Sequence, residues 1–215
     1  RLYRLAASKG YPPAKERLET CCRKNGLPVE PPAQEPENAG AGHPGGQAEV
    51  FGEGAGGYRE AADEGNAEAQ YRMGLCYENG DGVPQNYGEA VRLYRLAADQ
   101  GNPNARFRLG LCYYSGKGLK KDYEQAVEYL THAALQGINE AQFYVGDCYE
   151  NGLGVGQDYA EAARFYRYAA NQGYAEAQYR LAVYYEKGQG VLRNYVEAAR
   201  LYPPGGAHGG GRGAG

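Results

Sequence analysis

Residues 66–101 read NAEAQYRMGLCYENGDGVPQNYGEAVRLYRLAADQG, and the same pattern returns three more times at a spacing of 36 residues. The second copy is NPNARFRLGLCYYSGKGLKKDYEQAVEYLTHAALQG, from Asn102, and the third is INEAQFYVGDCYENGLGVGQDYAEAARFYRYAANQG, from Ile138. The fourth, from Tyr174, is YAEAQYRLAVYYEKGQGVLRNYVEAARLY. A fixed period of this length is typical of a solenoid, in which each unit packs only on its neighbours. The period favours an extended binding surface over a catalytic pocket.

Each copy predicts a pair of helices. In the first helix of the first copy, roughly residues 67–78, Ala69, Met73 and Tyr77 form an apolar stripe at four-residue spacing. Gly80, with a second glycine two residues later, ends this helix. Small residues recur in both helices where two backbones must approach closely: Gly74, Gly110, Gly146 and Ala182 in the first, and Ala90, Ala126, Ala162 and Ala198 in the second.

A capping signal opens the second helix of every copy. The pairs are Asn86 and Glu89, Asp122 and Gln125, Asp158 and Glu161, and Asn194 and Glu197. In a capping box the first side chain accepts a hydrogen bond from an early helix N–H, and the second side chain reaches back to the N–H of the cap residue. We expect both bonds here. The buried face is predicted at Ala90, Leu93, Tyr94 and Ala97, and the helix should end at Gly101.

Composition changes mark the predicted domain boundaries. Residues 1–27 read as a partial repeat, and residues 58–202 as the repeat solenoid. Residues 28–57 are rich in Pro, Gly and Glu and contain no Lys or Arg, so they are predicted to be a disordered insertion. A Gly-rich, disordered tail is expected at 203–215. Because the chain begins at Arg1 rather than Met, we expect a fragment or a processed chain.

Charge and cysteine content narrow the functional class. The net charge is −3 with both signs mixed, so neither nucleic acid binding nor membrane insertion is expected. Cys76, Cys112 and Cys148 occupy one repeat position without metal-ligand spacing, and they are predicted to be small, buried apolar side chains. No metal or other cofactor is expected. Unpaired thiols favour a reducing, cytoplasmic location.

The repeated units resemble Sel1-like repeats, relatives of the tetratricopeptide repeat. The shared motif appears in the first copy as Ala69, Met73–Gly74, Tyr77, Gly80, Gly82–Val83, Asn86, Ala90, Tyr94, Ala97–Ala98 and Gly101. This resemblance implies an all-α, right-handed superhelical solenoid of antiparallel helix pairs. It also implies a non-catalytic scaffold or adaptor that binds protein partners.

The sequence offers little for an enzyme. Its Ser and Thr residues are only Ser8, Thr20, Ser115 and Thr131, and none lies in a known nucleophile motif. Glycine-rich residues 152–156 follow a predicted helix rather than a strand, so they do not fit a dinucleotide-binding turn. A hydrolase-type enzyme stays as a remote alternative, with His132 as its only candidate base.

The geometry of the related tetratricopeptide repeats, carried over by this resemblance, places the first helices on the concave face. The predicted partner-binding residues are Glu68, Tyr71, Leu75 and Glu78; Asn104, Phe107, Leu111 and Tyr114; Glu140, Phe143, Asp147 and Glu150; and Glu176, Tyr179, Val183 and Glu186. They form an aromatic row flanked by seven acids and no base.

Two interpretations of this row are open. The aromatic stripe can be core, or it can bind a partner peptide or helix that is apolar with Lys or Arg nearby. The alternative function is structural assembly, in which uncapped ends self-associate or stack on other repeats.

Overall fold

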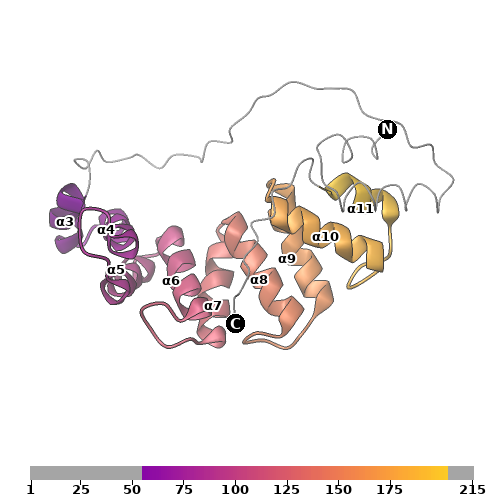
Figure 1. Ribbon diagram of the computed structural model, residues 1–215, viewed down its shortest axis with the longest axis horizontal. Helices are drawn as coiled ribbons and strands as arrows, with labels where there is room; N and C mark the ends of the chain where they lie inside the picture. Colours follow the sequence, from indigo (N-terminus) through magenta and orange to yellow (C-terminus); the bar gives the residue numbers. More distant parts are fainter. Residues whose placement is uncertain (1–54, 203–215) are drawn as a thin grey trace, which may run out of the picture. The chain divides into compact units, whose positions relative to one another are not determined.

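Nine α-helices follow one another along residues 55–202, the part of the chain that the computed structural model describes (Figure 1). In chain order they are α3 (Ala55–Asp63), α4 (Ala67–Asn79), α5 (Tyr87–Asp99), α6 (Pro103–Ser115), α7 (Tyr123–Leu135), α8 (Asn139–Asn151), α9 (Tyr159–Asn171), α10 (Ala175–Lys187) and α11 (Tyr195–Leu201). The predicted all-α fold of repeated helix pairs is confirmed. The predictions for residues 1–27, 28–54 and 203–215 lie outside the described residues.

The described residues divide into two compact units, 55–165 and 166–202, and the division falls within α9. In the first unit consecutive helices pack on one another, from α3 on α4 through to α7 on α8. In the second unit α10 packs on α11.

The start of α3 corrects one predicted boundary. Residues 55–57, expected in the disordered insertion, form the first turn of this helix. Ala55 is buried in a cluster with Met73 and Cys76 of α4. This turn was not predicted from the average composition of 30 residues, because one small residue that packs on α4 changes that average very little.

The second helices begin with only half of the predicted capping box. The Asn86 side chain accepts from the N–H of Glu89 at 3.2 Å, as expected. The N–H of Asn86, however, donates to the carbonyl of Tyr77 at 2.9 Å, and Glu89 pairs with Arg92 instead. The prediction that Glu89 bonds to the cap N–H is therefore wrong, because the end of the first helix already supplies an acceptor.

The buried face of the second helix lies where the pattern predicted it. In α5, Ala90, Leu93, Tyr94 and Ala97 are all buried, and Tyr94 is completely enclosed. The helix ends before Gly101, whose φ of 91° is in the left-handed region.

The three repeated cysteines are buried free thiols, as predicted. Burial raises the pKa of Cys112 to about 11 and that of Cys148 to about 12. Burial also raises the pKa of Cys76. The reactive thiolate is therefore disfavoured near neutral pH, which fits a packing role.

Packing explains the second glycine of the Gly-x-Gly loop in the second and third copies. A Cβ on Gly118 would meet the backbone carbonyl of Tyr87, at the start of the second helix of the preceding copy. Gly154 meets Tyr123 in the same way. These glycines let each loop approach the preceding helix pair, so the glycine-rich loops are structural.

One type of hydrogen bond between copies was not predicted from the sequence. In each copy the side chain of the fourth residue of the first helix donates to a carbonyl near the end of the preceding second helix. The bonds are Gln70 to Ala62 (3.2 Å), Arg106 to Ala98 (3.2 Å), Gln142 to Ala134 (3.1 Å) and Gln178 to Ala170 (3.2 Å). Each of these carbonyls also accepts from the N–H of the glycine three residues later, so the side chain is a second donor to a carbonyl of the last helical turn.

Close approach within a pair gives the first testable expectation. A Cβ on Gly110 would lie 2.8 Å from Cγ of Leu130 and 3.2 Å from its backbone N. We expect Gly110→Ala to lower the free energy of unfolding by about 1–3 kcal/mol through overpacking. Urea unfolding followed by circular dichroism measures this change.

Gly56→Ala is the matched control, because a Cβ on this helical glycine meets nothing within 4 Å. Alanine should leave stability unchanged or raise it by up to about 1 kcal/mol through helix propensity. Equal effects of the two substitutions would contradict close packing at Gly110.

Candidate functional site

The candidate site is the row of first-helix residues that the sequence predicted, and each unit is considered separately. In residues 55–165, Tyr71, Phe107 and Phe143 are all half-buried. Tyr71 packs on the cluster around Leu109, and Phe107 on the cluster around Leu130. Each of these two rings is therefore anchored on one side while part of its surface stays open.

Where the first copy meets the second, the acids of the row are already paired. The hydroxyl of Tyr94 donates to Glu78, and Arg108 of the next first helix lies 3.6 Å from the same carboxylate. Glu68 forms a 2.6 Å ion pair with Arg72. The row itself contains no base, but two arginines beside it neutralise its acids in this copy.

The pKa directions agree with this pairing. Burial, and then the bond to Glu78, raise the pKa of Tyr94 well above its usual range. Burial lowers the pKa of Arg108, but Glu78 and Tyr71 outweigh that effect and raise it overall. Both groups therefore keep their protons, and Glu78 serves the packing between copies.

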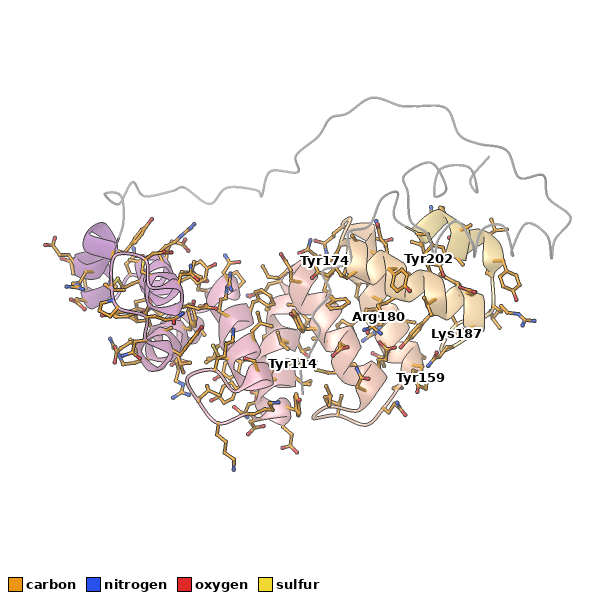
Figure 2. The ribbon with its side chains drawn as sticks, in the orientation of Figure 1. Tyr114, Tyr159, Tyr174, Arg180, Lys187 and Tyr202 are labelled. Carbon is orange, nitrogen blue, oxygen red and sulfur yellow. The ribbon has the colours of Figure 1, made fainter. Side chains whose placement is uncertain are left out.

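Where the second copy meets the third, aromatic rings replace the charges. Tyr144 of α8 stands at the position of Arg108, and its ring centroid lies 6.3 Å from that of Phe107 and 5.4 Å from that of Tyr114. The Tyr114 hydroxyl, labelled in Figure 2, donates to Asp147 at 2.6 Å. Burial, and then the bond to Asp147, raise the pKa of Tyr114.

In the unit of residues 166–202, the hydroxyl of Tyr202, a residue labelled in Figure 2, donates to Glu186 at 2.7 Å. The rings of Tyr179 and Tyr202 meet edge-on at 5.9 Å. Val183 is half-buried and Glu176 is exposed. Glu186 therefore accepts from a tyrosine of its own helix pair, as Glu78 does in the first copy.

The remaining predicted residues, all half-buried, are Leu75, Asn104, Leu111, Glu140 and Glu150. The pairing of these acids could have been predicted from the sequence. In Glu78–Tyr94 and Glu186–Tyr202, a Glu of the first helix is followed 16 residues later by the Tyr that donates to it. In the second copy both change together, to Tyr114 and Leu130.

His132, the base of the remote enzymatic alternative, is exposed on α7. Within residues 55–202, no three His, Cys, Asp or Glu side chains gather in a way that could hold a metal ion. None of the helices in this range combines the length and apolarity needed to cross a bilayer.

The helical fold and the hydrogen bonds repeated between copies define an all-α protein of stacked helix pairs. The Sel1 repeat family model matches residues 67–102, 103–138, 139–174 and 175–202, and the chain belongs to this family. Sel1 repeat proteins generally act as protein-interaction scaffolds and are typically non-catalytic.

Two solved structures are similar over much of the chain. A Sel1 repeat protein from Oxalobacter formigenes is 36% identical with a TM-score of 0.66, and the match covers 69% of this chain and 61% of that one. The protective antigen c5321 from uropathogenic Escherichia coli, which displays an SLR fold, is 31% identical with a TM-score of 0.67. That match covers 93% of this chain and 38% of c5321, so this chain spans only part of either protein. A comparison with curated proteins found no match.

Removal of the hydroxyl of Tyr94 tests the structural role of Glu78. Tyr94→Phe keeps the buried ring but leaves Glu78 without this donor, so we expect a loss of about 1.5–3 kcal/mol in the free energy of unfolding. Urea unfolding gives the value. Tyr87→Phe, which removes a hydroxyl from an exposed contact with Gln85, should stay within about 0.5 kcal/mol of the parent. A Tyr94→Phe variant as stable as the parent would show that Glu78 is not held in this way.

Proposed function

We propose that this chain is a non-catalytic scaffold or adaptor that binds a partner peptide or helix along the face formed by its first helices. The observation that carries the proposal is the recurrence of half-buried aromatic rings at one repeat position, at Tyr71, Phe107 and Phe143. Rings that are fixed by packing and still partly accessible offer apolar contact area at a low entropic cost. The general role of Sel1 repeats as interaction scaffolds supports the same proposal.

The charges beside these rings indicate the kind of partner. The acids of the first copy are neutralised by Arg72 and Arg108, whereas Glu140 and Asp147 form no ion pair with any residue of the described part. A basic or apolar partner therefore suits this face better than an acidic one. The buried free thiols support a reducing, cytoplasmic location as part of the proposal.

A crosslinking pull-down from the native lysate, with the full chain as bait, tests the proposal. We expect Phe107→Ala combined with Phe143→Ala to lose the partner while circular dichroism shows an intact fold. The matched control combines Leu96→Ala and Leu135→Ala, which remove exposed apolar side chains from the second helices α5 and α7. This control should keep the partner. A partner lost in the control and kept in the first variant would place binding on the second helices and contradict the proposal.

End-to-end assembly is a second candidate, favoured by two exposed apolar side chains in the last described repeat. Leu192 is 92% exposed and Val196 is 51% exposed. If this repeat stacks on another copy, light scattering should show a mass that rises with concentration, and Leu192→Ser with Val196→Ser should abolish the rise. A constant monomer mass for the unmodified chain would exclude this candidate.

A further inference from the structure

One arginine of the repeat is missing in the third copy. The position held by Arg72, Arg108 and Arg180 in the other copies is Tyr144 in the third. In the first copy Arg72 pairs with Glu68 at 2.6 Å and lies 5.7 Å above the centre of the Tyr71 ring. In the first copy, therefore, Glu68 and the Tyr71 ring both contact the guanidinium group of Arg72.

The third copy keeps the acid and the ring without the arginine. Glu140 stands at the position of Glu68, and Phe143 at that of Tyr71. With Tyr144 in place of the arginine, Glu140 has no basic partner at the spacing of four residues that joins Glu68 to Arg72. Within residues 55–202 no basic side chain pairs with Glu140.

A second unneutralised acid lies on the same side of α8. Asp147 follows Glu140 by seven residues, or two helical turns, with Tyr144 between them. Its carboxylate accepts from the Tyr114 hydroxyl at 2.6 Å and from the Asn151 side chain at 3.0 Å. Both donors are neutral, so the negative charge stays uncompensated in the part of the chain that is described.

Aromatic rings lie around Tyr144, which stands between these two acids along α8. The ring centroid of Tyr144 lies 5.6 Å from that of Phe143, in addition to its contacts with Phe107 and Tyr114. All four rings are half-buried. A resident cation, Lys121, lies 5.5 Å from the centre of the Tyr123 ring, which meets Tyr114 edge-on, so it reaches the border of this group and not the carboxylates. The α8 cluster is defined as Phe107, Tyr114, Glu140, Phe143, Tyr144 and Asp147.

We propose that the α8 cluster binds an arginine or lysine side chain of a partner segment. This inference rests on the proposed function. It states that the partner carries a basic side chain where it meets the third copy. Ring faces attract a cation through their quadrupole, and more strongly where water is partly excluded. The two carboxylates complement its charge and reject acidic segments. Two helical turns separate the backbones of Glu140 and Asp147 by about 10 Å along the helix axis, and within residues 55–202 no group of three His, Cys, Asp or Glu side chains could hold a metal ion instead.

Selection of random dodecapeptides displayed on phage, with the full chain as target, tests this inference. Three targets are compared: the parent chain, Tyr144→Arg and Thr131→Arg. Tyr144→Arg restores the arginine that the other copies carry and so fills the cluster from within. Thr131→Arg adds the same charge on α7, where the other copies carry Arg95 and Arg167, and serves as the matched control.

We expect peptides enriched on the parent and on Thr131→Arg to share an excess of Arg or Lys that is absent from the Tyr144→Arg pool. For one enriched peptide, replacement of its arginine by neutral citrulline should weaken binding roughly five-fold or more, as the loss of one cation–π contact predicts. Tyr144→Arg should weaken the parent peptide by a similar factor while its melting curve shows a folded protein.

Two results would overturn the inference, and they differ in what they say of the proposed function. Peptides that lack basic residues, bind Tyr144→Arg as well as the parent, and are lost with Phe107→Ala and Phe143→Ala would leave the binding face in place and remove its cation site. No enrichment on any target would remove both.

Discussion

The structure depends on one hydrogen bond between copies: a buried or half-buried side chain of each first helix donates to a carbonyl of the helix before it. Gln70, Arg106, Gln142 and Gln178 make this bond to Ala62, Ala98, Ala134 and Ala170. Without the next copy, that carbonyl would lose this donor. The bond therefore fixes the register of each first helix against the end of the preceding second helix, and Gly118 and Gly154 let their loops approach the start of that second helix.

Fixed register has a functional consequence. Because the same hydrogen bond recurs at each first helix, a substitution in one copy changes the side-chain contacts of that copy without moving its helices out of register. The contrast between Arg108 and Tyr144 is such a change. Arg108 pairs with Glu78 of the preceding copy and neutralises it. Tyr144, at the equivalent position, packs in an aromatic group beside Asp147, which no basic side chain neutralises in the described residues. A solenoid of near-identical units can acquire a specific binding position in this way without any change of fold.

Sequence reasoning succeeded where the cause is local. The 36-residue period, the N-cap side chains, the glycine helix ends and the buried face around Tyr94 depend on residues within one helix pair, and the structure bears them out. It failed where distant groups compete. The N–H of Asn86 was expected to bond to Glu89 but donates to the Tyr77 carbonyl instead. Glu78 was expected on an open acidic face, but it accepts from Tyr94 and pairs with Arg108. The hydrogen bonds of Gln70 and Gln142 link residues eight positions apart across a turn, so helical periodicity gave no sign of them.

Hydrogen exchange of the side-chain amides of Gln70 and Gln142 is the most direct test of the central bond. Both side chains are buried, with 4% and 6% of their surface exposed, and both donate to a backbone carbonyl. The account predicts that their NH₂ protons, followed by NMR in the intact chain, exchange far more slowly than those of the exposed Gln136. Exchange of Gln70 and Gln142 at the rate of Gln136 would show that the copies are not held together in this way.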